Sequence, residues 1–526
     1  MGQEPQPRGR FGAGASLALV VLLGLALYLP FLGYAGFTQS EGFRVFPAWE
    51  MLHNHDWLVT RLFEQPYLRK PPGMPWAIAL ATMIFGETEF AARSVSAFSM
   101  VIGSLVCWWA GRRWFGLRGG TLAGLAYLVA PVFWADPGPG RAAEIEAMHN
   151  LCVLTLIVMV VDVARTRQQP GQGGISHEAW LRPWHALAMS LALGAAFLVK
   201  GPSGLPAIGG VVMAGLLLTR SRRWLVSLCV ALLLGGGVVL WWFLALKGAI
   251  DRLDLPPVRE PAGQFLWSPG KELNVLLLPL AAIGAGMPSM LGPFFVLAFG
   301  PRGGSPGRIL SLGSLLGIGL YTVIGVSNHR YVMPALTLGP LALPACVEVF
   351  ARALPGTRAR RLGTVLQLAR PGVVIGVLAL AGALYSVRLE HRKATRTSGK
   401  EAGIRLGQAL ARDVLEHRTP GATAEVWGDE FIDTRPEVLW YARREAAGAG
   451  VTLRVRWTPG LDTSLLAPPA GGYLILRDDS GEREFREPEW PAYEKAGIFE
   501  GVKPVATGNA HVFTFRVYRD RKVPAW

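Results

Sequence analysis

Residues 12–34 read GAGASLALVVLLGLALYLPFLGY, an apolar run of about 23 residues without a charged side chain. A transmembrane helix needs about 20 consecutive apolar residues to cross the hydrocarbon core of a bilayer. The run is also longer than the apolar core of a cleavable signal peptide. We therefore interpret it as a first membrane-spanning helix or a signal anchor.

Similar apolar runs recur along most of the chain. They fall near residues 91–111, 119–134, 147–163, 183–199, 203–219, 224–246, 273–299, 309–326, 331–351 and 371–388. The chain is 51% hydrophobic and only 17% charged, with a mean hydropathy of +0.32. A globular chain carries roughly 25% charged residues. We predict a polytopic α-helical membrane protein with about eleven spanning helices.

The distribution of charge between the runs predicts their orientation. Arginines concentrate in alternate connections, around residues 112–118, 165–182, 220–223, 302–308 and 352–370, whereas acidic residues concentrate in the loops between them. Positively charged loops face the cytoplasm. The acidic loops and the C-terminal segment are therefore predicted to lie outside the cell (inner) membrane, in the periplasm of a bacterium. The net charge of +15 reflects these arginines. We predict contact with membrane lipids and not with nucleic acid.

Four cysteines lie inside apolar runs, at Cys107, Cys152, Cys229 and Cys346. Cysteines in such surroundings are typical packed thiols. Their positions therefore predict neither a disulfide framework nor a metal cluster.

The composition changes near residue 389, where charged and apolar residues begin to alternate. Residues 404–417 are predicted to form an amphipathic helix. Residues 425–427, 472–476 and 511–518 are predicted strands, the last an edge or closing strand. We predict a membrane domain over residues 1–388, with an outer loop at 35–90, and a small C-terminal α/β domain over residues 389–526. Within the outer loop, residues 43–52 and 71–86 are predicted short helices.

The first outer loop carries an acid, Glu41, shortly after the first apolar run, and Arg44 close behind it. Arg69 and Lys70 precede two prolines that fix the backbone direction at the start of the next helix. An acid and a cationic pair are suited to acid/base chemistry and to phosphate binding. The alternative is an ordinary solvated loop with interfacial cations.

The second outer loop holds Arg141, Glu144, Glu146 and His149 at the opening of an apolar run. In a helix that starts at Arg141, Glu146 and His149 share one face. Ionisable groups at that depth usually face a site or a cavity. The alternative is a helix start whose acids favour the helix dipole.

Further cations follow at the outer ends of later runs. They are Lys200 and, beside each other, His329, Arg330 and Tyr331. Each alone is typical of an interface residue, but together with the acids they predict a shared polar pocket. A divalent metal held by Glu41, Glu146 and histidines is possible, although the spacing carries no recognisable ligand signature.

At these residues the sequence resembles the bacterial lipid-linked glycosyltransferases related to aminoarabinose transferases and protein O-mannosyltransferases, which share a large membrane fold called GT-C. The matching motifs are Pro-Tyr-x-x-Lys-Pro-Pro at residues 66–72, Glu-Phe-Ala-Ala-Arg at 89–93, Gly-Arg at 140–141 before Glu146, Lys-Gly-Pro at 200–202, and Arg-Tyr-x-x-Pro at 330–334. One position departs from the family pattern, because Ser40 stands where the family has its usual catalytic Asp.

The resemblance implies inverting transfer of a sugar from a polyprenyl-phosphate donor to a glycolipid, protein or polymer acceptor outside the membrane. It implies Glu41 as the base or acceptor-orienting acid, with Glu146 or Glu144 able to take that role given Ser40. Donor phosphate binding is implied for Lys70, Arg69, Arg330 and Lys200, and substrate binding for Arg44, Arg141, His149, His329 and Tyr331.

Two other classes of protein are compatible with many apolar helices. A membrane transporter or lipid flippase commonly shows inverted repeats and broken helices, and we find no such repeat in the sequence. A non-catalytic scaffold would leave the ordered acids and the Lys-Pro-Pro motif unexplained. We expect a glycosyltransferase.

Overall fold

The computed structural model describes residues 12–63, 65–67, 70–134, 138–165, 183–219, 224–252, 272–287, 289–300, 304–326, 329–353, 398–428, 436–457, 473–478, 493–504 and 510–520. Contacts divide the chain into two compact units. The membrane-helix unit comprises Met1–Pro30, Ser94–Ala245 and Arg259–Ser386, and the outer-loop unit comprises Phe31–Arg93, Leu246–Val258 and Val387–Trp526. The first outer loop thus groups with C-terminal residues. The predicted domain limits at 388 and 389 lie outside the described residues and stay a prediction.

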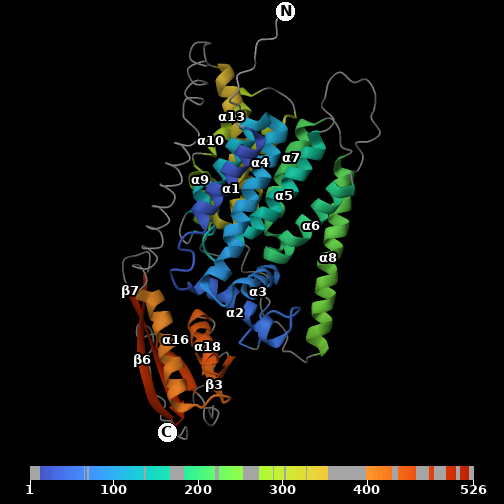
Figure 1. Ribbon diagram of the computed structural model, residues 1–526. Helices are drawn as coiled ribbons and strands as arrows, with labels where there is room; N and C mark the ends of the chain where they lie inside the picture. The colour runs from blue at the N-terminus through green and yellow to red at the C-terminus, as the bar shows by residue number, and fades with distance from the viewer. Residues whose placement is uncertain are drawn as a thin grey trace, which may run out of the picture. The chain divides into compact units, whose positions relative to one another are not determined.

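The membrane-helix unit is built from apolar helices (Figure 1). They are α1 (Ala13–Tyr28), α4 (Glu89–Leu128), η1 (Pro131–Phe133), α5 (Ile145–Arg165), α6 (Pro183–Lys200), η3 (Gly201–Gly204), α7 (Leu205–Leu218), α8 (Trp224–Arg252), α9 (Glu272–Ala285), α10 (Leu291–Phe299), α11 (Pro306–Val323), η5 (His329–Val332), α12 (Met333–Leu336) and α13 (Leu338–Ala353). The first residues of α4 and the last of α8 belong to the outer-loop unit.

Within the described residues, five helical stretches are long and apolar enough to cross a membrane. They are Glu89–Phe133, Ile145–Val163, His185–Leu218, Leu228–Ala249 and Arg330–Phe350. The first and third stretches each contain two of the predicted apolar runs. The run at 371–388 lies outside the described residues. The chain is therefore a multi-pass membrane protein, whereas the number of eleven spans stays a prediction.

Helix α4 is two helices that meet at Gly116, where φ is +77°. Only glycine adopts that conformation without strain. The two halves then run back along each other closely: a Cβ on Gly120 would lie 2.6 Å from the carbonyl oxygen of Trp108. Arg112 and Arg118 flank the turn. The structure thus confirms separate helices near 91–111 and 119–134.

Helices α7 and α11 also pack through small residues. A Cβ on Gly210 of α7 would collide with the backbone of Gly313 and Gly317 of α11. The two α11 glycines are four residues apart and so share one face of that helix. Small residues let helix backbones approach closely where no hydrophobic effect drives association.

Among the described residues, the outer-loop unit combines helices with a two-stranded and a five-stranded sheet. Its elements are α2 (Gln39–Asn54), β1 (Arg61–Leu62), β2 (Gln65–Pro66), α3 (Gly73–Phe85), α16 (Ser398–His417), β3 (Thr423–Gly428), α18 (Pro436–Gly448), β4 (Thr452–Trp457), β5 (Tyr473–Asp478), β6 (Tyr493–Pro504) and β7 (Ala510–Asp520). The structure confirms the predicted helices at 43–52, 71–86 and 404–417 and the three predicted strands.

The larger sheet has the order β4-β3-β5-β7-β6. Strands β4, β3 and β5 are parallel, whereas β5, β7 and β6 are antiparallel. Helix α16 packs against α18 and β6 (Figure 1). The prediction that residues 511–518 form an edge or closing strand is wrong, because β7 pairs on both sides. Its neighbour β6 is interrupted by glycines and charged residues, and it lacks the alternating apolar pattern that marks a strand.

All four cysteines are free thiols. Cys107 is buried and Cys152 and Cys346 are half-buried, as expected of packed thiols. Cys229 is exposed on the apolar helix α8, so the prediction that it is packed is wrong.

Candidate active site

Two carboxylates and two cations converge in the membrane-helix unit, and we call Glu144, Glu146, Lys200 and Arg330 the second-loop cluster. Lys200 Nζ lies 3.3 Å from Glu146 Oε1. Arg330 Nη2 lies 3.7 Å from both Glu146 Oε1 and Glu144 Oε1. The four side chains come from the segment before α5, its first turn, the end of α6 and η5. The structure thus brings together residues that lie far apart in the sequence.

The cluster is largely withdrawn from solvent. The side chains of Glu144 and Lys200 are each 3% exposed, whereas that of Arg330 is 31% exposed. Charged groups among apolar helices are costly unless they are paired, and in membrane proteins they usually mark functional positions. Lys200 Nζ also lies 4.4 Å from the centre of the Tyr331 ring, a cation–π distance. Arg330 is the member most accessible to a ligand.

A break in the helix between α6 and α7 determines where the side chain of Lys200 lies. Gly201 has φ +65°, and Pro202 lacks the amide hydrogen that would continue helix α6. Tyr321 Oη donates a hydrogen bond of 2.6 Å to the Ser203 carbonyl oxygen and so ties the break to α11. The Lys-Gly-Pro motif therefore ends α6 with the ammonium beside Glu146.

Helix α5 begins at Ile145, four residues later than Arg141. His149 is buried, and its Nε2 lies 3.3 Å from Ser203 Oγ at the helix break. Asn150 donates to Tyr127 Oη and accepts from Thr337 Oγ1 within the helix core. These contacts pack the start of α5 against neighbouring segments, and substrate binding by His149 stays a prediction.

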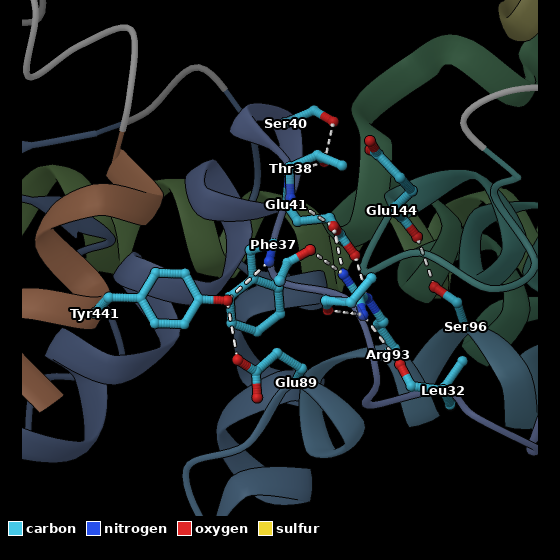
Figure 2. A network of polar contacts seen from close by, with 12 residues as sticks. Leu32, Phe37, Thr38, Ser40, Glu41, Glu89, Arg93, Ser96, Glu144 and Tyr441 are labelled. Carbon is cyan, nitrogen blue, oxygen red and sulfur yellow. Dashed lines mark hydrogen bonds and ion pairs between the residues drawn. The ribbon is translucent and has the colours of Figure 1, made fainter. Parts of the chain in front are cut away.

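Glu41 and Arg93 form a buried ion pair in the outer-loop unit (Figure 2). Arg93 Nε donates to Glu41 Oε1 at 2.7 Å and its Nη2 to Oε2 at 3.0 Å. Thr38 is the N-cap of α2, and its amide donates to Glu41 Oε2 at 2.7 Å while its hydroxyl accepts from the Glu41 amide. This reciprocal capping box satisfies two main-chain donors at the start of the helix.

The same arginine also holds the chain before α2. Its Nη1 donates to the carbonyl oxygens of Leu32 and Ala35, and its Nη2 donates to that of Gly36. Both Glu41 and Arg93 are 1% exposed. A general base must reach the proton that it abstracts, and the Glu41 carboxylate is already occupied by three donors. The Glu146 side chain is 9% exposed, against 1% for Glu41 and 3% for Glu144. This difference in exposure favours the alternative in which Glu146 carries that role.

Sequence reasoning did not single out Arg93 as a site residue. The sequence nevertheless indicates that this arginine is important, because it stands inside the apolar run 91–111 and at the end of the Glu-Phe-Ala-Ala-Arg motif. A cation within such a run requires a partner, and Glu41 supplies it.

The remaining predicted site residues make other contacts or lie outside the described residues. The buried Arg141 guanidinium donates to the carbonyl oxygens of Leu27 and Pro30, as basic side chains do at the end of a helix. Lys70 is half-buried, and Arg44 is half-buried with Nη1 3.4 Å from the Phe43 carbonyl oxygen. Arg69 and the His329 side chain lie outside the described residues. Across the described parts of the chain, no group of three or more His, Cys, Asp or Glu side chains is placed to hold a metal ion.

Residues 69–246 match the sequence model of the family described as dolichyl-phosphate-mannose-protein mannosyltransferase. The chain is also similar to proteins named undecaprenyl phosphate-alpha-4-amino-4-deoxy-L-arabinose arabinosyl transferase. It is 30% identical to one from Sodalis glossinidius over 243 residues, which are 45% of this chain and 40% of that protein. It is 25% identical to one from Pseudomonas fluorescens over 389 residues, 70% of this chain and 61% of that protein. The chain thus spans less than two thirds of the length of these relatives.

Among solved structures, the chain is similar to ArnT from Cupriavidus metallidurans bound to undecaprenyl phosphate. The TM-score is 0.64 at 17% sequence identity, with 96% of this chain and 98% of that chain covered. The apo state of the same protein gives a TM-score of 0.62. The predicted resemblance is therefore confirmed: the chain has the GT-C membrane fold of ArnT and resembles the lipid-linked glycosyltransferases in sequence.

Proposed function

We propose that the chain is a membrane glycosyltransferase that moves a sugar from a polyprenyl-phosphate donor to an acceptor outside the membrane. The ArnT-like fold and the names of the sequence relatives support this reaction class. The convergence of Glu144, Glu146, Lys200 and Arg330 among apolar helices carries the proposal. The acceptor is a glycolipid, protein or polymer, the enzyme lies in the inner membrane, and the C-terminal segment lies in the periplasm.

Lys200 and Arg330 bind the donor phosphate in this mechanism. A lysine is a compact point charge for phosphate, and an arginine adds a fork of donors. As the bond between the anomeric carbon and the phosphate oxygen breaks, both electrons of the bond stay with the polyprenyl phosphate. The two cations stabilise that developing charge. Lys70 and Arg69 remain further candidates for phosphate binding.

Glu146 is the proposed base. It takes the proton of the acceptor hydroxyl, whose oxygen forms the new bond to the anomeric carbon as the phosphate leaves. Glu144 keeps Arg330 in place through their 3.7 Å contact. By the family resemblance alone, in which the usual acid stands at the position of Ser40, we assign residues 38–41 of the outer loop to acceptor orientation. A single displacement of this kind inverts the configuration at the anomeric carbon.

Transfer by the full chain in liposomes tests the proposal. The donor is undecaprenyl phosphate carrying labelled 4-amino-4-deoxy-L-arabinose, with a mannose donor in parallel, and lipid A, envelope protein and envelope polymer are offered as acceptors. Glu146→Gln and Lys200→Gln should each lower transfer at least about a hundredfold. Glu348→Gln and Lys247→Gln are the matched controls, because both original side chains are exposed. They should retain wild-type transfer.

Wild-type transfer by either Glu146→Gln or Lys200→Gln would exclude the assigned roles. Label that crosses the bilayer while it remains on the donor lipid would instead identify a lipid flippase.

A further inference from the structure

Tyr441 of α18 holds the main chain immediately before α2 (Figure 2). Its hydroxyl oxygen accepts a 2.8 Å hydrogen bond from the Phe37 amide and donates one of 2.9 Å to Glu89 Oε1. Burial, reinforced by the neighbouring Glu89 carboxylate, raises the pKa of Tyr441 far above its ordinary value. The phenol therefore keeps its proton and remains a donor to Glu89.

The same helix makes two further contacts with the outer loop. The Arg443 guanidinium lies 3.6 Å from the centre of the Trp49 ring on α2, and its Nη1 lies 3.8 Å from Glu50 Oε1. Arg444 Nη1 lies 3.6 Å from Glu89 Oε2, the carboxylate that also accepts from Tyr441. Because Glu50 is 1% exposed and Arg443 9% exposed at their side chains, this pair is screened little by solvent.

The start of α18 fits against the first turn of α2. A Cβ on Gly42 would lie 2.6 Å from the Glu437 amide nitrogen and 2.9 Å from Pro436 Cγ. Real Cβ atoms do not approach other atoms so closely. Only glycine at position 42 therefore lets α18 pack this closely against α2. The turn over residues 37–42 is thus fixed by Arg93 through Glu41 and by α18 through Phe37 and Gly42.

We propose that α18 is a positioning element for sugar transfer and that Tyr441 is its main positioning residue. The proposal rests on the proposed function, because it assigns the turn at residues 38–41 to acceptor orientation. Tyr441 touches neither substrate: it acts through the Phe37 peptide, which leads directly into Thr38, Ser40 and Glu41. The C-terminal segment is then part of the catalytic apparatus as well as a candidate for acceptor recognition.

The variant Tyr441→Phe in the full chain, in lipid nanodiscs, tests this assignment. It keeps the ring that packs on Phe37 and Trp440 but loses both hydroxyl contacts. We expect faster hydrogen exchange at residues 36–42 and a kcat lower by about three- to tenfold. The KM for the donor should stay within about twofold of the wild-type value, because Tyr441 does not bind the donor.

Tyr28→Phe is the matched control. It also loses a buried hydroxyl hydrogen bond to the main chain, the 2.7 Å bond to the Leu128 carbonyl oxygen. The side chain that it alters contacts Leu128 and Trp134 of the membrane-helix unit. It should leave both the exchange at residues 36–42 and kcat unchanged. A general loss of stability would instead lower activity in both variants alike.

An unchanged kcat in Tyr441→Phe, whatever its KM, would overturn the proposal, as would unchanged exchange at residues 36–42. If wild-type protein transfers no sugar from any donor, the proposed function fails instead. The exchange measurement then still decides whether Tyr441 holds the turn.

Discussion

The Glu41 carboxylate accepts two hydrogen bonds from Arg93 and one from the Thr38 amide. The two side chains are among the least exposed charged groups of the described chain. Their arrangement satisfies the carboxylate and, at the same time, anchors three carbonyl groups of the preceding turn. The sequence resemblance assigns Glu41 a catalytic role. Its contacts are instead those of a carboxylate that stabilises the fold.

Glu41→Gln should therefore destabilise the protein as well as affect transfer. Removal of one partner of a buried ion pair leaves an uncompensated charge and typically costs about 3–5 kcal/mol. We expect a clearly lower unfolding temperature in detergent, followed by tryptophan fluorescence. The control Glu348→Gln, whose side chain is 49% exposed, should stay within about 0.5 kcal/mol of wild type. Unchanged unfolding together with abolished transfer would return the role of base to Glu41.

Helices of the membrane-helix unit are joined and packed by glycine at defined points. Gly116 permits the reversal within α4, Gly201 permits the break after Lys200, and Gly210 lets α7 contact the backbone of α11. The break places a cation beside Glu146, so local backbone chemistry at the end of one helix builds part of the site.

Gly210→Ala should lower stability, because the new methyl group would collide with the backbone of Gly313 and Gly317 and force the helices apart. Overpacking of this kind typically costs about 1–3 kcal/mol. Gly236→Ala on α8 is the matched control, since a Cβ there meets nothing within 4 Å. It should be neutral or slightly stabilising, because alanine favours a helix more than glycine does. Equal unfolding temperatures for the two variants would contradict the close packing of α7 on α11.

Much of the fold could be predicted, because the length of each apolar run and the charges beside it determine whether that segment forms a membrane helix and which way it points. The helices at 43–52 and 404–417 follow from their amphipathic pattern, and the helix at 71–86 follows from its apolar composition. The reversal near Gly116 follows from arginines between two apolar runs. Strand β6 was missed because glycines and charged residues break its apolar alternation, although its partner β7 follows it directly in sequence. The packing of helix α18 on α2 could not be predicted, because the two helices lie far apart in the sequence. The capping box of Thr38 and Glu41 was visible as a Thr-x-x-Glu spacing.

Part of the candidate site could also be predicted from the positions of charged residues beside the apolar runs. The sequence places Glu146, Lys200 and Arg330 at the outer ends of apolar runs, but it does not show that they contact one another. Nor does it show that Glu41 is neutralised by Arg93 or that Tyr441 contacts Phe37. Those pairings depend on tertiary packing between segments up to 404 residues apart.

At the scale of the whole molecule, the predicted orientation can be measured directly. In a background without the four native cysteines, Arg412→Cys and Arg118→Cys each place one thiol at an exposed position. A membrane-impermeant maleimide should label Arg412→Cys in spheroplasts but label Arg118→Cys only after permeabilisation, because arginine-rich loops face the cytoplasm. The reverse pattern would contradict the assignment of the acidic loops to the outside.

The most direct test of the central claim is the stoichiometry and stereochemistry of a single reaction. Wild-type full-length protein in liposomes is given the undecaprenyl-phosphate sugar and the acceptor panel, and released undecaprenyl phosphate and glycosylated product are quantified together. The account predicts one undecaprenyl phosphate released for each sugar transferred, with the anomeric configuration of the product inverted by NMR. Unconsumed donor with every acceptor, or a product that retains the donor configuration, would contradict it.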